Sequence, residues 1–186
     1  DWSSDVCSSD LGKVFVVMEV LVGQPLADLM DNAGALPVER SLAIGEQVAS
    51  ALVVAHQAGI VHRDIKPENI LLAEGYALVA DFGVARAIES AGLSNLTEPG
   101  MAVGTPLYMS PEQAEMTSVD VDTRSDVYSL GVLLYELLTG TTPIDSERLK
   151  RVAFDELRRI IREDEPPPPS TRLSTLGELA RKIGRA

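Results

Sequence analysis

Residues His62–Asn69, with the sequence HRDIKPEN, place four charged side chains, one imidazole and a proline between two apolar runs. Asp81 follows a later apolar run, so Asp64, Asn69 and Asp81 are all expected on loops at the ends of paired strands. A solvated turn is the simplest interpretation of a charge cluster. However, two carboxylates and an amide suit phosphoryl transfer, which needs a base to orient a hydroxyl and hard oxygen ligands to hold Mg²⁺ on phosphates.

Each polar residue of this group suits one task in that chemistry. We expect Asp64 to be the base, Asn69 and Asp81 to be the Mg²⁺ ligands, and Lys66 to neutralise charge on the migrating phosphoryl group. A metal hydrolase on the same loops is a weaker hypothesis, because the sequence contains only two histidines and no ligating cluster of them.

The elements before this loop are predicted from apolar periodicity. Val14–Val20 is β-branched and apolar, as is typical of a buried strand, and GQP then turns the chain into a helix over Leu26–Met30. A longer helix is predicted over Arg40–Ala58, ended by Gly59. The apolar face expected for this longer helix consists of Leu42, Val48, Leu52 and Ala55.

The elements after the loop begin with a hairpin. Asn69–Ala73 and Tyr76–Ala80 are short apolar runs joined at Glu74-Gly75, which is typical of two antiparallel strands. A loop rich in Gly, Ser, Thr and Pro then occupies Glu89–Pro111. Loops of this length inside a domain are usually functional or disordered.

Arg124–Thr139 is apolar nearly all round, which predicts a buried central helix that is capped by Ser125 or Asp126 and ends at Gly140. The fold class is therefore mainly α with a small β component (α+β). The other predicted elements are an amphipathic helix over Val152–Ile161, an extended run over Pro166–Pro169 and helical content over Leu173–Ala186.

The composition is that of an ordinary globular protein, with 186 residues, 45% of them apolar and 24% charged. The net charge of −12 argues against a general nucleic-acid or anionic-membrane binder. We expect no membrane span, and the cytoplasm as location, with any membrane anchor of a longer protein outside this sequence. Cys7, the single cysteine, allows no internal disulfide.

The first eleven residues, DWSSDVCSSDL, have no helical or strand period and resemble a translated sequencing adaptor. We expect residues 1–11 to be an artefactual or disordered leader and residues 12–186 to be the domain. A natural disordered tail is the alternative.

Four motifs, in this order, resemble those of the protein kinase superfamily. HRDIKPEN resembles the catalytic loop, Asp81-Phe82-Gly83 the magnesium motif, Ser110-Pro111-Glu112 the Ala-Pro-Glu motif, and Asp126 the aspartate that anchors the catalytic-loop backbone. The stretches VHRDIKPENILL, DFGVAR and GTPLYMSPEQA are similar to bacterial Hanks-type Ser/Thr kinases, with a eukaryotic origin as the weaker alternative. The resemblance covers Gly12 to about Pro169 and implies a kinase-like C-lobe with a hinge strand.

The resemblance implies structural roles in the loop region. His62 is expected to pack beneath Phe82, with a second base as the less favoured role of this histidine. Arg63 is expected to pair with a phosphate on Thr97, although Thr97 is also interpretable as an ordinary loop hydroxyl. Lys66 and Thr105 are expected to bracket the base, as in kinases that act on Ser or Thr.

The resemblance also implies a nucleotide site, in which backbone groups of Glu19 and Leu21 meet adenine and Leu71 lies beneath it. The Gly-rich loop, strand lysine and helix glutamate of the family would lie before Gly12, so we expect the N-lobe to be largely absent. The family's partner for Glu112 is a late arginine, for which Arg172 is a poor candidate. We therefore expect Glu112 to lack a partner.

The function implied is ATP-dependent phosphorylation of Ser/Thr hydroxyls on protein substrates, with ATP and Mg²⁺ as cofactors. Because half of the nucleotide site is expected to be missing, we predict that this chain alone has little activity. The alternative is a pseudokinase or docking module, which would have no need of Asp64, Lys66, Asn69 and Asp81 together.

Overall fold

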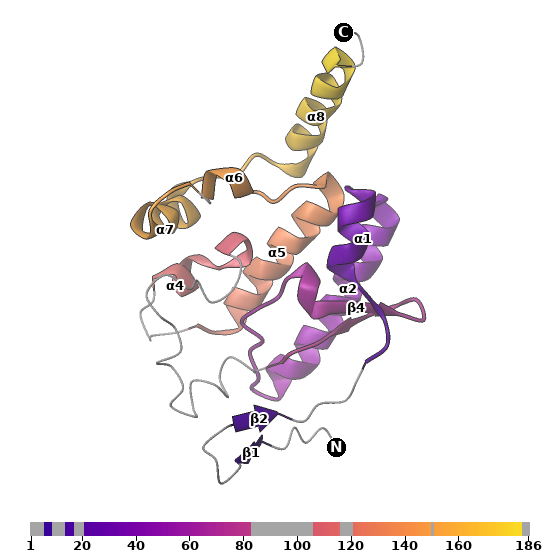
Figure 1. Cartoon of the computed structure of the whole chain (residues 1–186), viewed down its shortest axis with the longest axis vertical. Helices are drawn as coiled ribbons and strands as arrows, with labels where there is room; N and C mark the ends of the chain where they lie inside the picture. Colours follow the sequence, from indigo (N-terminus) through magenta and orange to yellow (C-terminus); the bar gives the residue numbers. More distant parts are fainter. Residues whose placement is uncertain are drawn as a thin grey trace.

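The computed structural model describes residues 6–8, 14–16, 21–82, 106–115, 121–149 and 151–183. Helices dominate this part of the chain, and a small antiparallel sheet accompanies them (Figure 1). The predicted mainly α fold with a small β component is confirmed. The helices are α1 (Leu26–Ala33), α2 (Val38–Gln57), α4 (Pro111–Ala114), α5 (Thr123–Thr139), α6 (Ser146–Leu149), α7 (Phe154–Glu163) and α8 (Pro169–Ile183), with the short 3₁₀ helices η1 (Pro67–Asn69) and η3 (Pro106–Tyr108).

The strands form two antiparallel sheets. β1 (Val6–Ser8) pairs with β2 (Val14–Val16), and the three-stranded sheet has the order β3 (Gln24–Pro25), β4 (Ile70–Ala73) and β5 (Tyr76–Val79). The predicted hairpin is thus present, with Glu74 at φ +51° and Gly75 at φ +87° in a two-residue turn. Positive φ at both central residues is the conformation that matches the twist of the flanking strands.

The first apolar cluster lies where α1, α2 and α5 meet the three-stranded sheet. Helices α2 and α5 pack against each other, and α2 also packs against β5 (Figure 1). Apolar side chains of these elements lose most of their contact with water, which stabilises each by about 1.5–3 kcal/mol. The fully buried members of this first cluster include Leu26, Val48, Ile65, Ile70, Leu133 and Leu137.

The second apolar cluster joins α4, α6 and α7. Helix α7 supplies Leu157, Ile160 and Ile161 to it, which confirms the prediction of an amphipathic helix in this region, although the helix runs over Phe154–Glu163 and not over Val152–Ile161. Helix α8 contacts α5 and then extends away from the body of the molecule (Figure 1). No helix among the described residues combines the length and the apolar character needed to cross a membrane.

The buried face of α2 differs from the predicted one. Leu42 is 52% exposed, whereas Ser41 and Ile44 are buried beside the expected Val48 and Leu52. Apolar residues occur on more than one face of this helix, and periodicity alone did not identify the face that meets the core. Leu42 instead lines a hollow of about 440 Å³ together with residues of α5.

The start of α5 also differs from the prediction. Asp122 is the N-cap, and its side chain accepts a hydrogen bond from the backbone N–H of Arg124 at 2.8 Å. Ser125 and Asp126, which were predicted as caps, lie within the first turn and are buried. Their polar groups bind other parts of the chain, as described below.

Three smaller differences concern local backbone. The predicted turn GQP contributes Gln24–Pro25 to the sheet as β3, and Val6–Ser8 forms a strand within residues 1–11, where no strand was predicted. Pro169 belongs to α8 instead of the extended run, because proline fits the first turn of a helix, where its missing N–H costs nothing.

Candidate active site

The loop that carries Asp64 is fixed by Asp126, a fully buried carboxylate on α5. Its Oδ2 accepts a hydrogen bond from the backbone N–H of His62 at 2.8 Å, and its Oδ1 accepts one from that of Arg63 at 2.7 Å. Oδ2 also lies 2.7 Å from Nε2 of His56 on α2. Arg63 has φ +71°, a left-handed conformation that costs an ordinary residue about 1–2 kcal/mol. Two hydrogen bonds to a buried charge offset this cost.

His62 links the same loop to the end of β5. Its Nε2 lies 2.8 Å from the carbonyl oxygen of Ala80, and its Nδ1 lies 3.2 Å from the backbone nitrogen of Asp64. Because the carbonyl only accepts and the amide only donates, Nε2 carries the hydrogen and Nδ1 is the acceptor. The His62 ring also meets the ring of Phe82 edge-on, with 4.7 Å between centroids.

Asp64, Lys66 and Asn69 lie together. The Nδ2 group of Asn69 donates to the main-chain oxygen of Asp64 at 2.8 Å and to its carboxylate Oδ2 at 2.9 Å. The ammonium group of Lys66 lies 2.7 Å from the same Oδ2. The side chain of Asp64 is 43% exposed and that of Lys66 only 16%. This carboxylate is thus held in one orientation while one side of it meets solvent.

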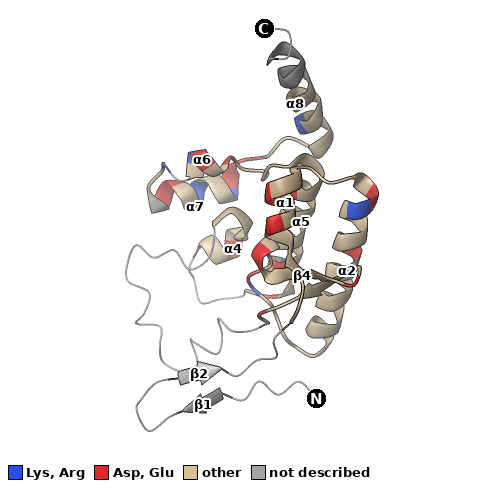
Figure 2. Ribbon diagram, turned by 45° about the vertical axis from the view of Figure 1, so that its right-hand side comes forward, with Lys and Arg blue, Asp and Glu red and all other residues tan. Residues whose placement is uncertain are grey.

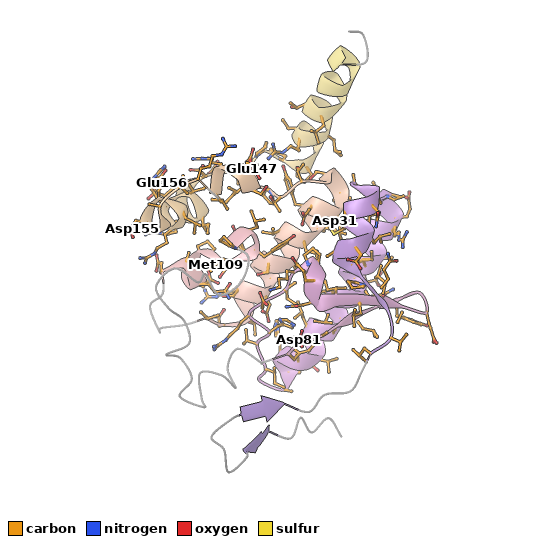
Figure 3. The ribbon with its side chains drawn as sticks, in the orientation of Figure 1. Asp31, Asp81, Met109, Glu147, Asp155 and Glu156 are labelled. Atoms are coloured by element: carbon orange, nitrogen blue, oxygen red, sulfur yellow. The ribbon has the colours of Figure 1, made fainter. Side chains whose placement is uncertain are left out.

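Asp81 adjoins this group through the hairpin. Ala80 donates its backbone N–H to the carbonyl of Asn69 at 2.9 Å, so Asp81 follows directly after the residue paired with Asn69. Asp81 is exposed and has φ +62°. Figure 3 shows it far from Glu147, Asp155 and Glu156 of α6 and α7, at the opposite end of the molecule. Helices α6 and α7 carry both acidic and basic residues, and these charges are separate from this site (Figure 2).

The donor set at this point fits Mg²⁺. Both Nδ2 hydrogens of Asn69 are directed to Asp64, which leaves the oxygen Oδ1 as the part of the amide available to a cation. Asp81 offers an exposed carboxylate next to it along the paired backbone. No three His, Cys, Asp or Glu side chains cluster in the described part of the chain. Magnesium needs few protein oxygens, since water and phosphates complete its shell.

The remaining predicted residues are only partly described. Leu71 lies on β4, is half-buried and pairs with Pro25 and Leu78 on the neighbouring strands. Leu21 is half-buried and precedes β3. The other predicted site residues lie outside the described residues: Glu19, Gly83, Thr97 and Thr105.

The expectation that Glu112 lacks a partner is wrong. Its Oε1 accepts a hydrogen bond from the hydroxyl of Ser125 at 2.5 Å. Arg172, the residue considered as its partner, instead donates to the hydroxyl of Tyr135 at 3.2 Å and to the carbonyl of Pro143 at 3.0 Å. The sequence search considered only a cation as partner and overlooked a serine on the buried helix.

Two polar residues near the loop were missed in the sequence. His56 contacts Asp126, and Gln113 of α4 donates from Nε2 to the carbonyl of Arg63 at 2.7 Å. The spacing of Ser110 and Gln113 was a readable signal, since Ser-x-x-Gln is the pattern of a capping box. Such a box predicts a helix start but not the additional contact with the loop.

A buried tyrosine and a glutamate form another polar pair, between η3 and α5. Tyr108 of η3 donates its hydroxyl to Oε2 of Glu136 on α5. Burial raises the pKa of the Glu136 carboxyl, and the negative charges of Glu68 and Asp31 raise it further, although the Tyr108 hydrogen bond acts in the opposite direction. Burial and the charge of Glu136 also raise the pKa of Tyr108.

The fold and the loop geometry define the class of protein. The sequence profile described as "Protein kinase domain" matches residues 5–184, and the chain belongs to this family. The relatives compared below are bacterial proteins. The chain is 44% identical over 144 residues to the serine/threonine-protein kinase PknL of Mycobacterium tuberculosis. The matched segment covers 77% of this chain and 35% of PknL.

Two further relatives have similar names. The chain is 42% identical over 159 residues to the serine/threonine-protein kinase PknB of Mycobacterium tuberculosis, covering 85% of this chain and 24% of PknB. It is 42% identical over 145 residues to the probable serine/threonine-protein kinase CPE1738 of Clostridium perfringens, covering 77% of this chain and 20% of that protein. The chain thus spans between a fifth and about a third of the length of these relatives.

Proposed function

We propose that the protein containing this chain is an ATP-dependent kinase that phosphorylates Ser and Thr hydroxyls of other proteins. Membership of the protein kinase family implies the use of ATP and Mg²⁺ in general. The names of the relatives, which are bacterial serine/threonine-protein kinases, support the choice of substrate hydroxyl. We also propose residues 12–186 as the part of the chain that belongs to the domain.

The observation that carries the proposal is the fixed orientation of the Asp64 carboxylate by Asn69 and Lys66. A base must lie within hydrogen-bond reach of the hydroxyl that it deprotonates, and a carboxylate held on one side and open on the other meets this need. Asp64 would accept the proton of the substrate hydroxyl. Lys66, whose Nζ lies 2.7 Å from Oδ2 of Asp64, would neutralise charge on the transferred phosphoryl group.

The metal would be held by Asn69 through Oδ1 and by Asp81 through its carboxylate. When bound, Mg²⁺ neutralises charge on the phosphates of ATP. The positive φ of Arg63 and Asp81 is consistent with this assignment, because strained backbone tends to occur at functional sites where the surrounding structure enforces it. His62 and Asp126 would keep the loop backbone in place, and Phe82 would cover His62.

The other assignments extend the proposal to residues around this site. Arg63 would pair with a phosphate on Thr97, and Thr105 would contact the base. We assign Glu19, Leu21 and Leu71 to the adenine site and Gly83 to the magnesium motif. Glu112 would be a structural residue, whose carboxylate accepts a hydrogen bond from the hydroxyl of Ser125.

Metal-dependent nucleotide binding tests the proposal. Calorimetric titration of the purified chain with ATP should give binding in the presence of Mg²⁺ that is weakened at least about tenfold when the metal is chelated or in the variant Asp81→Asn, since Mg²⁺ bridges protein oxygens and phosphates. Asp155→Asn, which removes an exposed carboxylate of α7 at the other end of the molecule, is the matched control and should leave binding unchanged. Equal binding with and without the metal would contradict the magnesium assignment.

Phosphate transfer is the second test. We predict that the chain alone, incubated with ATP and Mg²⁺, transfers no phosphate to itself or to a generic protein. Turnover that disappears in Asp64→Asn would contradict this prediction for the chain and at the same time support Asp64 as the base.

A further inference from the structure

Gln113 connects two structural units that the sequence leaves 50 positions apart. It lies on α4, whose Ala114 is fully buried in the second apolar cluster, and its Nε2 donates to the carbonyl of Arg63 at 2.7 Å. This hydrogen bond joins a helix supported by α7 to the loop supported by α5.

The amide of Gln113 has only one orientation that satisfies its neighbours. Its Oε1 accepts from the backbone N–H of Ser110 at 3.0 Å, while the Ser110 hydroxyl accepts from the backbone N–H of Gln113 at 3.4 Å. Since Oε1 faces a donor, Nε2 must be the atom that faces the Arg63 carbonyl. The capping box therefore directs an N–H group at the loop and is more than a helix cap.

The group that Gln113 holds is the peptide that leads into Asp64. The carbonyl of this peptide, on Arg63, accepts from Gln113, and its N–H, on Asp64, lies 3.2 Å from Nδ1 of His62. The preceding N–H, on Arg63, is held by Asp126. Both polar groups of the peptide are therefore fixed from outside, and with them the plane from which the Asp64 side chain projects.

We propose that Gln113 is a positioning residue for Asp64, which it orients through the carbonyl of Arg63. The role as a base rests on the function proposed above, whereas the orientation of Asp64 by Gln113 does not. A simple cap would act on α4 alone, but the 2.7 Å contact with Arg63 extends the effect of Gln113 to the loop.

Two variants separate the cap from the contact with the loop. Gln113→Glu keeps an oxygen for the Ser110 N–H but places a second oxygen against the Arg63 carbonyl, where it has no hydrogen to donate when ionised. Gln113→Met removes the donor to Arg63 without adding charge. It also removes the Oε1 acceptor of the Ser110 N–H, so signals of α4 should shift in this variant as well. Ser110→Ala is the matched control, because it removes the hydroxyl half of the box and leaves both contacts of the Gln113 side chain in place.

The measurement is the backbone NMR spectrum of the chain together with amide hydrogen exchange. Both Gln113 variants should shift the ¹³C resonance of the Arg63 carbonyl and the ¹⁵N resonance of Asp64, and should raise amide exchange at Asp64 about tenfold, which corresponds to the loss of one ordinary hydrogen bond. Ser110→Ala should change signals of α4 and leave those of Arg63 and Asp64 in place.

The proposal is overturned if the NMR resonances of Arg63 and Asp64 and the amide exchange at Asp64 are unchanged in both Gln113 variants. It is also overturned if Ser110→Ala changes them by the same amount. Thermal unfolding of each variant shows whether the chain remains folded, and the uncharged Gln113→Met covers the case in which the glutamate variant unfolds. Failure of the proposed kinase function is seen separately, as loss of Mg²⁺-dependent ATP binding by the unsubstituted chain.

Discussion

The two apolar clusters of the molecule differ in the polar groups that accompany them. The cluster around α2 and α5 lies beside buried His62, Asn69 and Asp126, which hold the backbone and side chain of the loop that carries Asp64. The buried members of the cluster of α4, α6 and α7 are alanine, leucine and isoleucine side chains, and the buried polar residue beside them, Ser110, is the uncharged N-cap of α4. Apolar packing tolerates exchange of shape, whereas a buried hydrogen-bonded charge does not. The stability of the first region should therefore depend mainly on the polar groups of its buried side chains, and that of the second on side-chain volume.

Removal of the buried carboxylate is the strongest test of this difference. Asp126→Ala should lower the free energy of unfolding by about 3–5 kcal/mol, because the N–H groups of His62 and Arg63 lose their acceptor inside the protein. Urea denaturation measures the effect. Asp122→Ala, at the solvent-accessible N-cap of the same helix, is the control and should cost clearly less. Equal losses would mean that burial of Asp126 has no special importance.

Removal of volume from the second cluster should have a somewhat smaller effect. Ile160 is fully buried. Ile160→Ala should lower the free energy of unfolding by about 2–4 kcal/mol, because apolar burial is lost and a cavity remains. We expect the NMR signals of His62 and Asp126 to stay in place, since these residues belong to the other region. Large shifts of those signals would show that the two clusters respond as one unit.

The smallest expected effect is a change in pH dependence at Glu136 on α5. Its raised pKa means that the folded state binds the proton more tightly than the unfolded state, so its contribution to stability is present at low pH and is lost as the pH rises through the folded pKa. Glu136→Gln should remove this part of the slope and, because the side chain is only partly buried, should change stability at pH 7 by less than about 1 kcal/mol.

Unfolding by urea at several pH values between 4 and 8 measures this slope. As the pH rises, stability should fall more, or rise less, in the unsubstituted chain than in the glutamine variant. Tyr108→Phe serves as the comparison, because it removes the hydroxyl that donates to Glu136 and leaves the carboxyl in place. If stability depends on pH in the same way with glutamate and with glutamine at position 136, the raised pKa of Glu136 is contradicted.

The sequence predicted the backbone elements where a local signal existed. Glu74-Gly75 between two apolar runs identified the hairpin, and Gly140, at φ +71°, ends α5 as expected. The amphipathic pattern of α7 was equally clear. In each case neighbouring residues in the chain carry the physical cause, so no knowledge of the tertiary structure was needed.

The predictions that failed depended on contacts between distant segments. Leu42 is exposed and Ser41 is buried, because the packing of α2 against both α5 and β5 decides which of its faces is buried. Ser125 does not cap its helix because α5 begins two residues earlier, after the N-cap Asp122, and its hydroxyl donates instead to Glu112, 13 positions earlier. Gln113 could not be linked to Arg63 from spacing, since the two residues meet only after α4 and α5 have packed.

The two-residue turn at Glu74-Gly75 limits how this part of the chain can vary in length. Exposed loop tips normally accept insertions, but here the turn sets which residue of β5 faces each residue of β4. One added residue would shift this alignment and turn alternate side chains to the other face of the sheet. Asn69 would then no longer lie opposite Ala80, and the amide and carboxylate oxygens that flank the hairpin would lose their common position.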